Sequence, residues 1–169
     1  MAEGKLYMAI DPGKNGGFVI INTTGVVPEF MGKFDGSNLE TVYAAFKEIQ
    51  KLQSKLEAIG VEGQFSTGMG GSASSVRKLA NSAGWIAGVC RCLWPDTPLY
   101  SLAPSAWSGP TGVQGLPKKE RLEMFLKQAC ITDDRKKKAS ADLADAYFMA
   151  KYLRTRYLKS KEKLVRPQY

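Results

Sequence analysis

The order of apolar runs along the chain constrains its fold more than any other feature of the sequence. Three short runs come first, at residues 5–10, 18–21 and 26–31, and only brief turn-rich segments separate them. Short turns between successive strands predict an antiparallel meander. Two further apolar runs, at 58–61 and 99–102, are expected to form strands four and five.

Segments with helical periodicity alternate with these later strands. The first is expected to begin with a capping box, in which Ser37 and Glu40 stand three residues apart, and to end near Glu57. The remaining helices are expected at residues 76–90, 118–129 and 140–157. Strands joined by helical crossovers pair in parallel, so the order βββαβαβαα predicts an α/β fold with a mixed five-stranded sheet flanked by helices.

The length of 169 residues suits one domain. We expect the domain to span residues 1–158 and a basic C-terminal tail to span 159–169. Segments 66–75 and 109–117 are rich in Gly with Ser or Pro and are expected to be loops. No apolar run approaches the ~20 residues needed to cross a bilayer, and the first residues lack the apolar core of a signal peptide. A cytoplasmic protein with no membrane partner is therefore expected.

Composition narrows the chemistry further. The chain has no histidine, which excludes Ser-His-Asp hydrolysis, HExxH metalloproteases and nucleases with a histidine base. Any catalytic metal would need oxygen ligands, and these select Mg²⁺ or Mn²⁺. The formal net charge of +8 favours a polyanionic partner, although many basic proteins merely have a solvated cationic face.

Two carboxylates stand at the ends of predicted strands. Asp11 follows the first strand at a glycine-rich turn, and Glu62 follows the fourth strand, just before Gly63. Side chains at adjacent strand ends of an α/β sheet share one crevice. The simpler interpretation of Asp11 is that it forms the turn ahead of Pro12, which is a common use of aspartate.

Two more carboxylates lie on the last predicted helix. Asp142 and Asp145 are three residues apart, on one face, and residues 143–150 around them are almost entirely apolar. Two buried like charges are costly unless a cation or another partner compensates them. A favourable interaction with the helix dipole would account for Asp142 but not for Asp145, one turn deeper. With Asp11 and Glu62 they form the carboxylate set that a two-metal phosphodiesterase requires, which needs no protein nucleophile.

Three segments resemble the motifs of the RuvC family of Holliday-junction resolvases, which belong to the ribonuclease-H-like superfamily. Residues 9–13 (AIDPG), followed by two glycines at 16–17, resemble the first motif. Residues 61–65 (VEGQF) are similar to the second, and residues 142–146 (DLADA) to the third. The order and spacing match from about residue 5 to about 155.

The resemblance implies a ribonuclease-H-like fold and a function. Residues 1–158 would be a Mg²⁺-dependent nuclease domain, with Mn²⁺ as a substitute and two ions in each active site. A homodimer would resolve four-way DNA junctions by paired symmetric nicks, in the cytoplasm of a bacterial or phage-infected cell.

The resemblance also implies roles for individual residues. The catalytic metal ligands would be Asp11, Glu62, Asp142 and Asp145. Phe65 falls where the family has an aromatic residue that stacks on bases. Lys119, or its neighbour Lys118, falls where the family has a basic residue near the scissile phosphate. The chain departs from the pattern at Gly63, often glutamine in the family, and at Ser108, often lysine. The basic contact of that lysine is then either missing or supplied by Lys118 and Lys119.

Basic residues are expected to flank the acidic site and bind phosphates, with a solvated basic face as the alternative for any one of them. They are Arg77, Lys78, Lys118, Lys119, Arg121, Arg135, Lys136, Lys137 and Lys138. Gly84 and Gly88 form a GxxxG pattern that permits close backbone approach. We interpret it as packing against the sheet, with a dimer interface as the alternative.

Other functions share parts of this pattern. Another ribonuclease-H-like nuclease, acting on RNA–DNA hybrid or on branched or flap DNA, would use the same carboxylates. A non-catalytic junction-binding protein would not need all four. An actin-like ATP-binding fold would need a second domain, for which the chain is too short.

Overall fold

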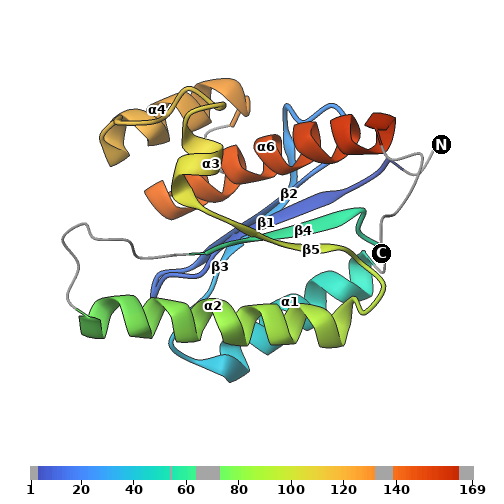
Figure 1. Cartoon of the computed structure of the whole chain (residues 1–169), viewed down its shortest axis with the longest axis vertical. Helices are drawn as coiled ribbons and strands as arrows, with labels where there is room; N and C mark the ends of the chain where they lie inside the picture. Colours follow the sequence, from blue (N-terminus) through green and yellow to red (C-terminus); the bar gives the residue numbers. More distant parts are fainter. Residues whose placement is uncertain (1–3, 54, 64–72, 132–138, 164–169) are drawn as a thin grey trace.

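The computed structural model of the chain describes residues 4–53, 55–63, 73–131 and 139–163, with side chains left out at 73–79 and 161–163. A single sheet lies between two layers of helices (Figure 1). Its strands are β1 (Tyr7–Asp11), β2 (Gly17–Ile21), β3 (Pro28–Lys33), β4 (Ala58–Glu62) and β5 (Leu99–Leu102). Their order in the sheet is β3-β2-β1-β4-β5.

The sheet is mixed, as the sequence predicts. The pairs β1–β2 and β2–β3 are antiparallel and form the expected meander. The pairs β1–β4 and β4–β5 are parallel. The predicted fold class, a mixed five-stranded sheet flanked by helices, is therefore confirmed.

Strand β1 lies in the middle of the sheet and contributes to both apolar cores. Successive side chains of a strand point to opposite faces. Tyr7 and Ala9 accordingly join one core, and Met8 and Ile10 the other, all of them fully buried. This double burial explains why the strand is an uninterrupted apolar run.

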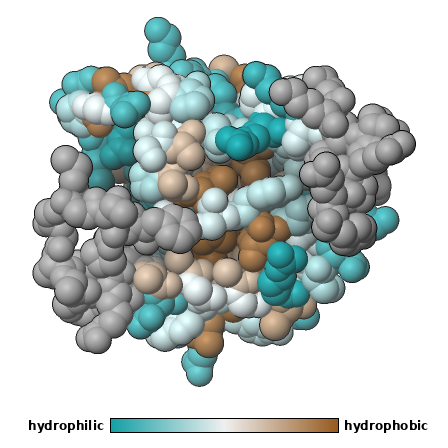
Figure 2. Space-filling view, in the orientation of Figure 1, coloured by the Kyte–Doolittle hydropathy of each residue, from teal (hydrophilic) through white to brown (hydrophobic). Residues whose placement is uncertain are grey.

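The helices divide between the two faces of the sheet (Figure 1). On one face lie α1 (Leu39–Leu52) and α2 (Ala73–Leu93). On the other lie α3 (Pro104–Ser108), α4 (Lys118–Gln128) and α6 (Ala141–Lys163). Helix α6 crosses β1, β2 and β4, and α4 packs on its outer side. Figure 2 shows apolar side chains along the middle of this view, between hydrophilic surfaces over the helical layers.

The start of α1 differs from the predicted capping box. The N-cap is Asn38, whose side-chain oxygen accepts hydrogen bonds from the Glu40 and Thr41 amides at 2.9 and 3.4 Å. The Ser37 hydroxyl instead donates to Asp35 at 2.5 Å. The assignment of Ser37 and Glu40 as a capping box is wrong because the neighbouring residue, also a good cap, takes that position.

Helix α1 also ends at Leu52, five residues before Glu57. The Gln53 amide makes the last helical bond, to the Ile49 carbonyl. The Glu57 amide then pairs with Leu6 next to β1, at 2.8 Å. The chain leaves the helix early because it must turn to enter β4.

Other boundaries agree or shift slightly. Helix α2 begins at Ala73, within the segment 66–75 that was expected to be a loop, of which residues 66–72 lie outside the described residues. The loop expected at 109–117 contains no helix or strand.

Helix α3 was not predicted, although Pro104 at its first turn is a typical helix start. Helix α6 continues to Lys163 rather than ending near residue 157. The division at 158/159 stays a prediction.

The glycines of the GxxxG pattern do not pack against the sheet. Gly84 and Gly88 are exposed, and a Cβ added to either would meet nothing within 4 Å. The packing interpretation is wrong because these residues lie on the outer face of α2. Across the described parts of the chain, no helix combines the length and apolarity needed to span a membrane.

The N-cap assignment can be tested by a pair of substitutions. Asn38→Ala is expected to lower the free energy of unfolding by about 1 kcal/mol, because two amides lose their side-chain acceptor. Ser37→Ala, the control, is expected to stay within about 0.5 kcal/mol of the wild type. Urea denaturation measures both, and a larger loss for Ser37→Ala would contradict the assignment.

Candidate active site

Asp11 and Glu62 lie side by side at one edge of the sheet. Each is the last residue of its strand, and β1 and β4 run parallel. Their register pairs Ile10 with Val61, the residues just before the two carboxylates. The two strand ends therefore lie next to each other, as expected from the sequence.

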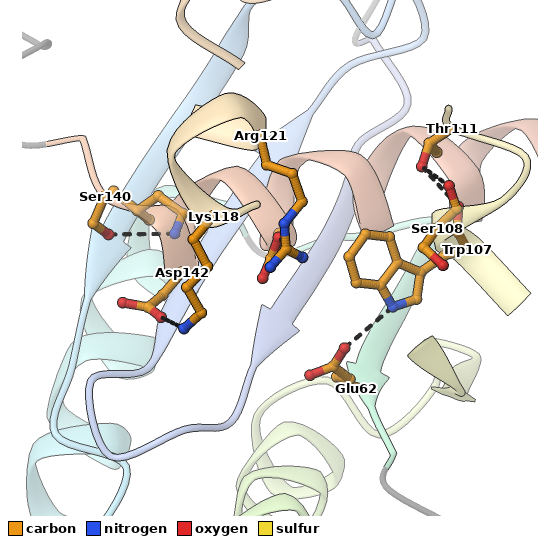
Figure 3. A network of polar contacts seen from close by, with 10 residues as sticks. Glu62, Trp107, Ser108, Thr111, Lys118, Arg121, Ser140 and Asp142 are labelled. Atoms are coloured by element: carbon orange, nitrogen blue, oxygen red, sulfur yellow. Dashed lines mark hydrogen bonds and ion pairs between the residues drawn. The ribbon is translucent and has the colours of Figure 1, made fainter. Parts of the chain in front are cut away.

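Helix α6 brings its two aspartates to the same edge. The Ser140 side chain accepts a hydrogen bond from the Leu143 amide at 3.4 Å and caps the helix (Figure 3). The first turn lies against Gly17, which pairs with Asp11 across the β1–β2 register. A Cβ on Gly17 would lie 3.1 Å from the Leu143 side chain and 3.4 Å from the Asp142 carbonyl oxygen. Glycine here permits the helix to approach the strand ends.

The electrostatics show that the carboxylates share one environment. Burial, together with the negative charges of Asp142 and Asp145, raises the pKa of Asp11 to about 6, against the lowering effect of its hydrogen bond with Gly13. Burial and then the charges of Asp11 and Asp145 raise the pKa of Glu62 to about 7. Burial also raises the pKa of Asp145, and Asp142 adds to it. The edge of the sheet therefore concentrates negative charge in a poorly solvated place.

Donors of the chain engage the two strand-end carboxylates. The Asp11 side chain accepts from the Gly13 amide at 3.1 Å. The Glu62 side chain accepts from the indole N–H of Trp107 at 3.2 Å (Figure 3). Trp107 is almost fully buried, in α3 just beyond β5. Its indole can therefore hold Glu62 in one orientation.

Sequence analysis missed the contact of Trp107 with Glu62. The available signal is its position shortly after β5, because β5 is parallel to β4 and ends at the same edge of the sheet. The unpredicted helix α3 then directs the indole towards Glu62 (Figure 3).

Basic residues of α4 engage the two helical carboxylates. Arg121 Nη1 lies 2.7 Å from Asp145 Oδ1, and Lys118 Nζ lies 3.8 Å from Asp142 Oδ1. Figure 3 shows both basic side chains extending from α4 towards α6. Helix α4 thus supplies positive charge to the acidic cluster, which consists of Asp11, Glu62, Asp142 and Asp145.

The structure describes only some of the other predicted DNA-binding residues. Lys119 is exposed on the first turn of α4, beside Lys118. Arg77 and Lys78 belong to α2, where only the backbone is described. The remaining predicted positions, Phe65, Arg135, Lys136, Lys137 and Lys138, lie outside the described residues.

The donor chemistry of the acidic cluster suits a hard divalent cation. Its side-chain ligands would all be oxygens, and a cation would relieve the charge repulsion that raises the pKa of Asp11 and Glu62. Within the described residues, however, no three Asp, Glu, Cys or His side chains are grouped closely enough to hold a metal ion. The carboxylates would therefore have to rearrange, leaving partners such as Arg121.

Comparison with known proteins identifies the fold. No protein-family profile and no curated protein sequence matches the chain. The solved structure of Thermus thermophilus RuvC in complex with a Holliday junction substrate matches with a TM-score of 0.65 and 17% identity, over 93% of this chain and 96% of that one. A second solved structure of Thermus thermophilus RuvC matches with a TM-score of 0.64 and 18% identity, over 93% of this chain and 96% of that one.

A third structure, the yeast mitochondrial Holliday junction resolvase Ydc2, reaches a TM-score of only 0.44 at 10% identity, over 91% of this chain and 85% of that one. The likeness to the Thermus structures shows that this chain has the RuvC fold, as the sequence motifs predict.

The raised pKa values predict how stability depends on pH without metal. Between about pH 4 and pH 7 the folded protein holds protons on Asp11 and Glu62 that the unfolded chain has released, so stability falls as pH rises. Glu62→Gln removes one of these charges and keeps an acceptor for Trp107. The free energy of unfolding of the variant, relative to that of the wild type, should therefore increase between about pH 5 and about pH 8, by at most about 3 kcal/mol.

Urea denaturation in chelator at both pH values measures this gain. A difference between variant and wild type that is the same at both pH values would contradict the raised pKa of Glu62.

Proposed function

We propose that this chain is a RuvC-family enzyme, a Mg²⁺-dependent endonuclease that resolves four-way DNA junctions. The observation that carries the proposal is the gathering of Asp11, Glu62, Asp142 and Asp145 at one edge of a RuvC-type sheet. Thermus thermophilus RuvC, which has this fold, has been solved in complex with a Holliday junction substrate.

The four carboxylates would be the ligands of two Mg²⁺ ions, for which Mn²⁺ can substitute. When bound, the ions would supply a charge that activates water and stabilises the leaving 3′-oxygen of the phosphodiester. Donors of the chain itself orient the site: the backbone amide of Gly13 donates to Asp11, and the indole N–H of Trp107 donates to Glu62. No histidine base is required, in keeping with the composition.

The basic residues of α4 are suited to hold the DNA backbone next to the carboxylates. Lys118 and Lys119 are exposed on its first turn, and Arg121 lies one turn further along. Lysine and arginine contacts to phosphates fix the position of a nucleic acid without reading its sequence. We assign Lys119 to the scissile phosphate, and Phe65 to stacking on bases at the junction centre.

We propose that the chain acts as a homodimer that makes paired symmetric nicks. A four-way junction with two-fold symmetry presents two equivalent strands, and a two-fold dimer presents two equivalent sites to them.

Two alternatives remain distinguishable by experiment. A ribonuclease-H-like nuclease specific for RNA–DNA hybrids or for branched or flap DNA would share the carboxylates. A non-catalytic junction-binding protein would share the basic surface alone.

The test compares substrates side by side: a synthetic four-way junction, its matched duplex, a flap and an RNA–DNA hybrid, each with Mg²⁺ and with chelator. The wild type is expected to nick the junction at paired positions, only with Mg²⁺, and to leave the duplex intact. Preferred cleavage of hybrid or flap would support the first alternative. Junction binding without any cleavage would support the second.

Asp145→Asn is the matched catalytic variant. It neutralises the least solvent-exposed of the four carboxylates with almost no change in size, and it replaces none of the basic residues. Junction cleavage is expected to fall by at least about 100-fold while junction binding is retained. Asp96→Asn, an exposed acid between α2 and β5, is the control and should cleave like the wild type. Near-normal cleavage by Asp145→Asn would remove Asp145 from the site.

A further inference from the structure

Helices α4 and α6 face each other with matched charges. Lys118 and Arg121 are three residues apart on α4, and Asp142 and Asp145 are three residues apart on α6, so each pair shares one helical face. The two ion pairs between them differ in burial. The side chains of Arg121 and Asp145 are only 18% and 11% exposed, whereas those of Lys118 and Asp142 are 68% and 27% exposed.

The buried pair leaves Arg121 incompletely bonded. Its guanidinium donates to Asp145 from Nη1 at 2.7 Å. Its Nε is buried and finds no acceptor within the described part of the chain. A fully structural arginine–carboxylate pair would normally use two parallel N–H donors, and an unsatisfied buried donor is costly. The geometry is that of a guanidinium supplying charge to Asp145 while one of its own donors remains unused.

Helix α4 does not depend on this pair for its attachment to α6. Phe125 is fully buried in the core, and its ring centroid lies 5.0 Å from that of Tyr147 on α6. Ala129, just beyond the helix, is also fully buried. Apolar packing therefore holds the second half of α4 in place, and the first half carries Lys118 and Arg121.

We propose that Arg121 is an exchangeable counter-cation of the active site. It neutralises Asp145 while the site lacks metal, leaves Asp145 when a divalent cation binds, and is then free to donate both Nε and Nη1 to a backbone phosphate of the DNA. Lys118 makes the same exchange at Asp142, more weakly, because that pair is longer and more exposed. This inference rests on the proposed metal-dependent function and extends it: metal binding and phosphate binding become coupled through one side chain.

The exchange has a definite thermodynamic consequence. If Arg121 and the metal compete for Asp145, removing the guanidinium must strengthen metal binding, because the metal no longer has to displace it. If Arg121 were a structural residue that positions Asp145 for the metal, removing it would weaken metal binding. The sign of the change therefore separates the two roles.

The decisive measurement is Mn²⁺ binding to the DNA-free protein by isothermal titration calorimetry. Arg121→Met keeps an unbranched apolar stem and removes the guanidinium with its charge, and is expected to bind Mn²⁺ at least about 5-fold more tightly than the wild type. Arg121→Lys keeps a competing charge and should remain close to the wild type. Lys127→Met, on the exposed last turn of α4, controls for the change in net charge and should also match the wild type.

Thermal unfolding of the same variants guards against a folding defect. Arg121→Met should melt lower than the wild type in chelator, because Asp145 is left unpaired, and should recover most of that difference at saturating Mn²⁺. A Met variant that stays destabilised at saturating Mn²⁺ and binds the ion no more tightly would overturn the exchange in favour of a structural ion pair.

Phosphate binding provides the second readout. With Ca²⁺ as a divalent ion in place of Mg²⁺, the slope of log junction affinity against log salt should steepen for the wild type relative to chelator, by about one phosphate contact for Arg121. Arg121→Met should lose that added contact. Equal metal-dependent steepening in the wild type and the Met variant would contradict the release of Arg121 to the DNA.

These outcomes separate the inference from the function on which it rests. A wild-type protein that binds no Mn²⁺ would overturn both. A wild-type protein that binds Mn²⁺ and cuts junctions, beside an Arg121→Met variant that binds Mn²⁺ equally or less tightly, would overturn the exchange alone.

Discussion

Helix α6 lies across the middle of the sheet through side chains that are buried without interruption from Leu143 to Ala150. This packing fixes where Asp142 and Asp145 stand, because both are part of the same rigid helix. The apolar contacts that hold the helix also exclude water from Asp145, and Gly17 permits the close approach that brings the helix to the strand ends. Like charges are therefore forced together at the edge of the sheet by hydrophobic burial elsewhere.

The surroundings of the carboxylates follow from this constraint. Charges that are poorly solvated need a compensating partner, and the chain provides two kinds. Neutral donors hold the carboxylates of the strand ends, where Trp107 bonds Glu62. Cationic donors from α4 hold those of the helix, where Arg121 bonds Asp145. This combination of carboxylates and basic side chains suits the divalent cations that we propose and, beside them, the phosphates that the basic residues would bind.

Much of this arrangement follows from local sequence patterns. The strand at 99–102 matches its predicted bounds, and the placement of Asp11 and Glu62 at neighbouring strand ends follows from strand order alone. The separation of Asp142 and Asp145 by three residues was sufficient to place them on one helical face. These features depend on contacts that are close in the sequence or on the rules of sheet topology, which a single sequence can reveal.

The features that sequence analysis missed depend on contacts between distant residues. The bond from Trp107 to Glu62 and the pair of Arg121 with Asp145 join different elements, and no spacing in the sequence encodes them. The choice of Asn38 over Ser37 as N-cap was missed for another reason, since both residue types are good caps and the backbone decides between them. For Gly84 and Gly88, the pattern of small residues could not show which face of α2 is turned to solvent.

The proposed function requires carboxylates from β1, β4 and α6 to hold divalent cations together. The most direct test is anomalous diffraction from crystals of the protein grown with Mn²⁺. We expect manganese peaks in contact with the carboxylate oxygens of Asp11 and of at least one of the aspartates of α6, Asp142 or Asp145, with Glu62 completing the site. Manganese bound only at other places on the protein, with these four carboxylates in contact with none, would contradict it.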